Sequence, residues 1–389
     1  MHVKPDAVHL LLPQRSSDMI EKTAKLNSIQ AARAFAALLV VLHHLSLSFE
    51  QRVAGIGFLK IFDHFGFAGV DLFFVISGLV MVVTCQRYFG RAAHASAFLW
   101  RRITRIYPLY WIFTLLQLVA ILLVPAAADR LLTAENIVSS FLLLPQAGYP
   151  ILAPGWTLVY EMFFYLVFSL LFFIPRRFSV HFLTGWGLLT TALYASQSTA
   201  GMSDTTDLVK LPIYASPMPL EFLAGCLIGF LYNRQINCFG KLSICVGTAL
   251  FVAGGWVVET YTDLSTEFGL TRVLVFGGAS SLVLYGLIAS EKSRRVNKLI
   301  QWMTSRKLVA LGDASYSLYL SHLLVINAFV TMWSHLHATN WYVQAIYEAI
   351  VLATCIGFAI ITFRLVERPI LARSQTSIAA GSGLMRAIT

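Results

Sequence analysis

The feature that most constrains the fold of this chain is a series of apolar blocks, each about 20 residues long, separated by short polar segments. An α-helix of that length spans the hydrocarbon core of a bilayer, because each residue adds about 1.5 Å to the helix. Only 12% of the 389 residues are charged, which is about half the share expected for a water-soluble domain. The alternating pattern of about ten residues that marks β-barrel strands is not seen. The sequence therefore predicts an all-α, polytopic transmembrane helical bundle.

Apolar stretches bounded by Gly, Pro or polar residues predict about ten membrane spans. They cover approximately residues 28–48, 67–86, 105–124, 155–174, 180–198, 215–232, 240–259, 270–290, 314–334 and 342–363. The apolar stretch at 136–145 is too short to span and is interpreted as a re-entrant or interfacial helix. We expect one membrane domain over residues 28–370, flanked by an N-terminal tail, 1–27, and a C-terminal tail, 371–389.

The basic residues of the chain, which give it a formal net charge of +10, indicate orientation rather than a nucleic-acid partner. Most of the 29 Lys and Arg residues fall in alternate segments between the spans, and such segments face the cytoplasm. Both termini are therefore predicted to be cytoplasmic. The five cysteines include no CxxC pair and their number is odd, so we predict neither a disulfide framework nor a metal site.

Ionisable side chains inside the predicted spans are costly in lipid and are therefore candidates for function. Arg33 and His44, both in the first span, are separated by about 16 Å along a helix. The helical turn of about 100° per residue also places Arg33 and His44 within about 20° of one face, whereas His43 points about 80° away. The full set of ionisable candidates is Arg33, His43, His44, Asp71, Glu161, Glu221, His322 and Glu348.

The outer half of the predicted membrane domain collects carboxylates beside an imidazole. Asp71 and Glu161 each lie a few residues inside the exterior end of their span, and His44 lies close to the same level. An imidazole can act as a general base for a hydroxyl, and a carboxylate bonded to its other nitrogen fixes the tautomer. Asp71 or Glu161 could fill that role for His44.

The inner side of the domain collects arginines. Arg33 lies at the inner end of the first span, on the same side as the basic segment that contains Arg101, Arg102 and Arg105. Guanidinium groups bind phosphate well, so these arginines are candidates for holding a phosphorylated donor. The separation of Arg33 from His44 is roughly the reach of an extended pantetheine arm. An acyl-CoA anchored at the inner side could therefore present its thioester to His44.

The residues alone also allow a structural role for each candidate. An intramembrane histidine or carboxylate can serve as a hydrogen-bonded strut between helices, and this is the favoured interpretation of His43. The arginines can be positive-inside anchors. Tyr316, Tyr319 and His322 follow a helix stripe that suits either packing or a substrate path.

Seven motifs, in order between Ser28 and Ile370, together resemble the acyltransferase 3 family of integral-membrane O-acyltransferases. Any one of them is weak, but seven in the right order are specific. They are IQAARAFAALLVVLHH, GVDLFFVISGLVM, FLWRRITRIYPLYW, GWTLVYEMFFY, LEFLAGCLIGFL, LGDASYSLYLSH and RLVERPI.

The resemblance implies a multi-pass enzyme of the bacterial inner membrane that moves an acyl group, usually acetyl, from acyl-CoA to a glycan hydroxyl. Within the family, the chain is most similar to bacterial exopolysaccharide acetyltransferases. His44 is implied as the essential histidine, and Arg33 and Glu161 are implied in function. Acyl-CoA is then a donor substrate rather than a bound cofactor, and the acceptor is an exported polysaccharide or its lipid-linked precursor. Unlike fused members of the family, the chain is not expected to carry a hydrolase-like domain after its last span.

We therefore predict an O-acyltransferase in contact with membrane lipids, acyl-CoA and a glycan. A rival from another class is a transporter or flippase for a lipid-linked sugar or acyl group, which would also explain the buried charges. The lack of an evident internal repeat and the family resemblance favour the enzyme. The predicted catalytic residues are His44, Glu161 and Asp71, and the predicted substrate-binding residues are Arg33, Arg101, Arg102, Arg105, Tyr316 and His322.

Overall fold

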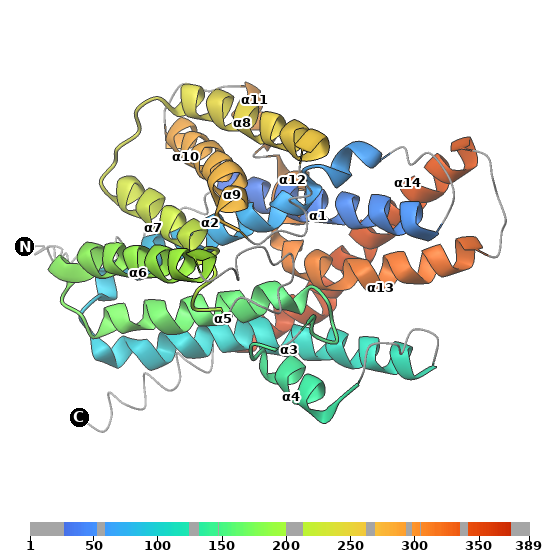
Figure 1. Cartoon of the computed structure of the whole chain (residues 1–389), viewed down its shortest axis with the longest axis horizontal. Coiled ribbons are helices and arrows are strands. Elements are labelled where there is room, and N and C mark those ends of the chain that lie inside the picture. Colours follow the sequence, from blue (N-terminus) through green and yellow to red (C-terminus); the bar gives the residue numbers. More distant parts are fainter. Residues whose placement is uncertain are drawn as a thin grey trace, which may run out of the picture.

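Long helices that lie side by side build the chain, as Figure 1 shows. The computed structural model describes residues 27–52, 59–123, 132–146, 148–199, 213–261, 269–292, 298–303, 305–334 and 341–374. No strand occurs within these ranges, so the prediction of an all-α helical bundle is confirmed. Most of the two predicted tails lies outside the described residues.

The helices have the following bounds. They are α1 (Asn27–Arg52), α2 (Gly69–Cys85), α3 (Ala95–Leu123), α4 (Ala134–Leu142), α5 (Gly155–Ser169), α6 (Ser179–Thr199), α7 (Pro219–Asn233), α8 (Gly240–Tyr261), α9 (Leu270–Arg272), α10 (Gly278–Lys292), α11 (Lys298–Met303), α12 (Arg306–Asp313), α13 (Ser315–Ser334) and α14 (Trp341–Thr362). Two short 3-10 turns, η3 (Lys60–Asp63) and η4 (Gly66–Ala68), lie between α1 and α2. Two π-helical turns follow α9 and α14, at Val273–Gly277 and Phe363–Glu367.

Eight helices of the described chain are long and apolar enough to cross a membrane. They are Asn27–Glu50, Gly66–Tyr88, Ala92–Leu123, Gly155–Phe172, Gly240–Val257, Leu270–Glu291, Ser315–Trp333 and Trp341–Ser374. The two other predicted spans, 180–198 and 215–232, are also helical, as α6 and as α7, which has 15 residues. The stretch expected to form a short helix, 136–145, overlaps α4, which has nine residues.

Helix α3 begins at Ala95, well before the predicted start at residue 105, because the basic segment continues the helix. Arginine favours helix, and its long side chain can carry the charge to the membrane interface. Further along α3, three aromatic side chains donate hydrogen bonds to carbonyl groups in the last turn of α4. The bonds run from Tyr107 to Leu142 (2.8 Å), from Tyr110 to Ser140 (2.7 Å) and from Trp111 to Phe141 (2.9 Å). They hold α4 against α3.

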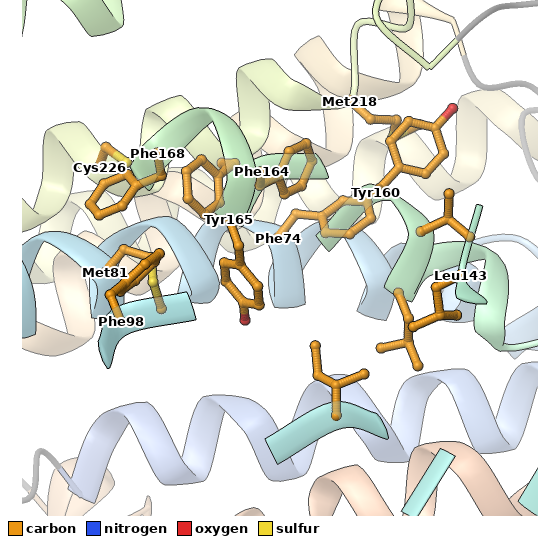
Figure 2. Packing of buried hydrophobic residues seen from close by; sticks show 14 of the residues in the cluster. Phe74, Met81, Phe98, Leu143, Tyr160, Phe164, Tyr165, Phe168, Met218 and Cys226 are labelled. Atoms are coloured by element: carbon orange, nitrogen blue, oxygen red, sulfur yellow. The ribbon is translucent and has the colours of Figure 1, made fainter. Parts of the chain in front are cut away.

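Helices α1 and α2 run through the middle of the bundle, with α8 and α10 on one side and α3, α4 and α5 on the other (Figure 1). Aromatic side chains fill the space between α2, α3, α5 and α7. Figure 2 shows part of this core, in which Phe164 and Phe168 of α5 lie near Phe74 and Cys226. The ring of Phe164 stacks on that of Phe222, with 4.8 Å between centroids. The core therefore fixes α5 against α2 and α7.

Glycines allow α2 and α7 to cross at close range. A Cβ atom added at Gly225 would lie 1.9 Å from the carbonyl oxygen of Val75, and one added at Gly78 would lie 1.9 Å from that of Phe222. Membrane helices associate largely through close packing, which small residues at a crossing permit. The crossing therefore requires glycine at both positions.

Replacing Gly225 by alanine is expected to destabilise the protein by about 2 kcal/mol or more, because the two backbones must move apart. Thermal unfolding of the detergent-purified protein measures this loss. Gly357→Ala in α14 is the matched control, since a Cβ atom there meets nothing within 4 Å. Equal unfolding temperatures for the two variants would contradict the close crossing.

Candidate active site

A cavity of about 330 Å³ opens between α1, α2, α3, α5 and α13. One wall is apolar and comes mainly from α2, whereas the other helices contribute polar and charged side chains. The polar side chains that matter for the chemistry are Arg33, Arg102, Arg105, Glu161, Tyr316 and Tyr319. The size is within the range of small-molecule sites in proteins.

Three guanidinium groups line the cavity against a single carboxylate, that of Glu161. Arg33 forms no side-chain hydrogen bond or ion pair in the described part of the chain. Arg105 is one of its nearest charged neighbours, and two like charges at one cavity favour an anionic guest. Arg102 lies over the rings of Phe98 and Tyr165, at 5.5 and 5.4 Å. The cavity is thus suited to a negatively charged ligand.

The predicted phosphate-binding arginines divide into two groups. Arg33, Arg102 and Arg105 are brought together at the cavity, although they come from α1 and α3. Arg101 is exposed and is absent from the cavity wall. The helical turn of α3 explains the difference, because Arg101 and Arg102 point about 100° apart.

Glu161 is held at the cavity wall by two hydroxyl groups. The Tyr165 hydroxyl, one helical turn along α5, donates a short hydrogen bond to Glu161 Oε1. The Ser77 hydroxyl of α2 donates to the same oxygen over 3.3 Å. Glu161 thus faces the arginines, and within the described chain no hydrogen bond joins it to His44.

Asp71 is bound to a different partner from the one considered for it in the sequence. The Nε and Nη2 atoms of Arg272 bind its carboxylate at 3.1 and 2.8 Å, and both side chains are buried. Arg272 also lies 4.9 Å from the ring of Phe67, and Glu221 is buried beside the pair. The structure therefore places Asp71 in an internal ion pair rather than at His44.

His44 is oriented by its own helix. Its Nδ1 lies 2.8 Å from the carbonyl oxygen of Val40. A carbonyl can only accept, so Nδ1 carries the proton and donates it. The lone pair is therefore on Nε2, which has no hydrogen-bond partner among the described residues. His44 is half-buried, so this nitrogen is available as a base.

His322 of α13 lies beside His44, with 5.0 Å between the ring centroids. Its Nδ1 donates to the carbonyl oxygen of Tyr319 over 2.7 Å, which again leaves the lone pair on Nε2. The ring of Tyr319 lies 5.9 Å from that of His322, and the Tyr319 hydroxyl is 3.0 Å from the Thr157 hydroxyl. Tyr319 and Thr157 line the cavity, so Tyr319 stands between the cavity and the imidazole pair. Tyr316, which donates to the Ile106 carbonyl, also lies on this wall.

His43 occupies a different environment from His44. It is buried, and its ring meets that of Phe67 at an angle, with 5.8 Å between centroids. A Cβ atom at Gly66 would lie 2.8 Å from the His43 Cβ, so the η4 turn sits directly on this side chain. His43 therefore packs against the segment between α1 and α2, and its ring lies 5.2 Å from that of His44, centroid to centroid.

Comparison with known proteins decides the class of this site. Residues 26–363 match a family model described as an acyltransferase domain, that of acyltransferase 3. The chain belongs to the acyltransferase 3 family. As a member of that family it is an enzyme, and its long apolar helices make it a multi-pass membrane acyltransferase. The prediction of an enzyme rather than a transporter without covalent chemistry is confirmed.

Individual relatives of this acyltransferase are similar over most of its length. The exopolysaccharide production protein ExoZ of Rhizobium meliloti (strain 1021) is 31% identical over 319 residues, 80% of this chain and 91% of ExoZ. Acyltransferase MdmB of Streptomyces mycarofaciens is 26% identical over 326 residues, 79% of this chain and 81% of MdmB. A Staphylococcus aureus (strain COL) protein named as an O-acetyltransferase is 25% identical over 392 residues, 90% of this chain and 58% of that protein. No solved structure matches the chain.

Four residues of the site were missed in the sequence: Ser77, Tyr165, Arg272 and Glu367. Arg272 is not among the candidates named from the sequence, yet it is buried. Asp71 and Glu161, predicted at a similar depth in the membrane, could have indicated a buried cation nearby, because buried carboxylates need one. Glu367 is buried, accepts from Ser317 over 2.6 Å and is a charged neighbour of Arg33.

Proposed function

We propose that this acyltransferase moves an acetyl group from acetyl-CoA to a hydroxyl of an exported polysaccharide, or of its lipid-linked precursor, in a bacterial inner membrane. The observation that carries the proposal is one cavity lined by Arg33, Arg102 and Arg105, whose lining residue Tyr319 lies beside the His322–His44 pair. One end suits the phosphates of a donor, and the other suits proton transfer from a hydroxyl.

The donor half rests on Arg33, Arg102 and Arg105. Guanidinium groups without a carboxylate partner bind phosphate through charge-assisted hydrogen bonds. The cavity is far too small for a whole CoA molecule, so its nucleotide would stay at the arginine end and only the pantetheine arm with its acyl group would enter. Tyr316 and Tyr319 would line the path of that arm towards the histidines.

The chemical step follows from the tautomer of His44. Its Nε2 takes the proton of the acceptor hydroxyl as that oxygen bonds to the thioester carbonyl carbon. The C–S bond then breaks, and the departing CoA sulfur receives the proton from His44. Alternatively, the Nε2 lone pair attacks the thioester carbonyl carbon, the C–S bond breaks and CoA leaves as a thiolate. The acceptor oxygen then takes the acyl group from the acyl-imidazole, its proton passes to the CoA thiolate, and Nε2 regains its lone pair. Both routes require a lone pair on Nε2, which the tautomer held by the Val40 carbonyl provides.

The acceptor class rests on the relatives. ExoZ is named for exopolysaccharide production, and the staphylococcal relative is named as an O-acetyltransferase. A polysaccharide hydroxyl is therefore the acceptor that we expect for this chain. Radiolabelled acetyl-CoA, incubated with membranes that contain or lack the protein, tests the function. Label in membrane-bound or exported glycan must depend on the protein, and equal labelling of both membranes would refute the proposal.

Replacing Arg33 by alanine is expected to raise the KM for acetyl-CoA about tenfold or more, because a charged hydrogen bond to the donor is lost. The same labelling assay, run over a range of acetyl-CoA concentrations, gives this value. Arg91→Ala is the control, because Arg91 is exposed and lies outside the cavity wall. An unchanged KM in the Arg33 variant would refute the placement of the donor.

A further inference from the structure

The two imidazoles of the site share an unusual property. His44 and His322 both donate Nδ1–H to a main-chain carbonyl one turn earlier in their own helices. Each ring is therefore fixed as the tautomer with its lone pair on Nε2. Two rings with centroids 5.0 Å apart thus carry two proton acceptors, and neither Nε2 has a hydrogen-bond partner among the described residues.

The two nitrogens differ in their access to a substrate. His44 is half-buried, whereas His322 is fully buried and its Nε2 has no hydrogen-bond partner among the described residues. A buried polar atom without a partner is costly, so its presence calls for an explanation. His322 is too enclosed to meet an acceptor hydroxyl, but it lies beside the ring that takes up a proton during transfer.

From this arrangement we infer that His322 is a positioning residue, which stabilises the imidazolium form of His44 by offering its Nε2 lone pair to that transient charge. The inference rests on the proposed function. The hydroxyl proton moves to His44 and then to the CoA sulfur, and His322 accepts a hydrogen bond without taking the proton. Two imidazoles this close in a poorly hydrated site hold one proton at most, so His322 stays neutral throughout.

No carboxylate binds His44 or His322 in the described chain, which distinguishes this site from a triad with an acidic third member. Asp71 is engaged by Arg272, and Glu367 accepts from Ser317. The Val40 carbonyl takes the Nδ1–H that a triad carboxylate would accept, so a neutral imidazole is the group left to stabilise the charge on His44. Titratable or charged groups on elements packed around the pair include Arg33, His43 and Glu50 on α1, Lys60 and Asp63 on η3, Asp71 on α2, Arg102 and Arg105 on α3, Asp313 on α12, and Glu348 on α14.

His322→Phe removes the lone pair and keeps an aromatic ring. The imidazolium of His44 then loses an acceptor, so His44 gives up its proton at lower pH. We expect the ascending limb of the pH–rate profile to move about one pH unit lower, and the plateau rate to fall about tenfold or more. His322→Gln places an amide oxygen near the position of Nε2. It should restore most of the plateau rate and return the limb to near its wild-type pH. The assay measures transfer of label from acetyl-CoA to membrane glycan.

Two controls make the profile specific. His43→Phe changes a neighbouring imidazole outside the cavity and should leave the limb in place. Burial raises the pKa of Asp63 to about 6. If the ascending limb of the pH–rate profile came from Asp63, it would disappear in Asp63→Asn, and His322→Phe would not shift it. The position of a limb does not depend on the amount of folded enzyme, so partial misfolding of a variant does not obscure the result.

The outcomes separate this inference from the proposed function. A limb that moves in His322→Phe and returns in His322→Gln supports the positioning role. Loss of rate in both variants with an unmoved limb, or no loss in either, overturns it. If the wild-type protein itself transfers no label, the proposed function fails before the role of His322 is reached.

Discussion

Replacing His44 by alanine is expected to lower acyl transfer by about 10²- to 10⁴-fold, which is the usual contribution of a general base. The variant loses an Nε2 lone pair on a half-buried ring, whereas the neighbouring His322 is fully buried. Binding of acetyl-CoA should survive, because Arg33, Arg102 and Arg105 are unchanged. Label transfer and equilibrium binding of acetyl-CoA to detergent-purified protein measure the two effects separately.

His43→Ala is the matched control for this experiment, since the two histidines are adjacent in sequence and point in different directions. Transfer by the His43 variant should stay within about threefold of wild type, because its ring packs against Phe67 rather than the cavity. Equal losses in both variants would overturn the assignment of the base to His44. Normal transfer by His44→Ala would exclude general-base catalysis by this residue.

Replacing Arg272 by glutamine is expected to destabilise the protein by about 3–5 kcal/mol, because it leaves the Asp71 carboxylate buried without its cation. Glu221 is buried next to the pair, so a second acidic group is also left without compensation. The effect should appear as a lower unfolding temperature in detergent and a lower yield of monodisperse protein.

The double variant Arg272→Gln with Asp71→Asn removes both charges together and should regain much of the lost stability. It also tests Asp71 as a catalytic residue. If the ion pair is structural, the folded double variant transfers acetyl groups at close to the wild-type rate. A double variant that folds well but is inactive would instead indicate that Asp71 takes part in catalysis.

The helical bundle could be predicted from the sequence because membrane spans are set by length and polarity alone. The pairing of Arg33 with His44 on one face of α1 could be predicted for a similar reason, since helical phase depends only on spacing. These properties are local. The same reasoning separated His44 from His43, and the structure places His43 against the η4 turn.

The partners of the site residues depend on how helices pack, and the sequence pattern does not encode that directly. Asp71 and Glu161 had similar predicted depths, yet one meets Arg272 of α9 and the other meets Tyr165 of its own helix. Arg101 and Arg102 are adjacent, and only the fold shows which of them faces the cavity. The orientation of His44 by the Val40 carbonyl was missed because backbone groups are the same in every sequence.

Because of this last contact, helix α1 alone sets the distance and the orientation between Arg33 and His44. The donor anchor Arg33, the carbonyl of Val40 and the base His44 are carried by one continuous helix, so their relative positions follow from helical pitch and not from the packing of neighbours. Inserting or deleting one residue between Arg33 and His44 would turn the base by about 100° away from its anchor. The length of this interval should therefore tolerate no insertions or deletions, whereas the loops that join the other helices are free to vary.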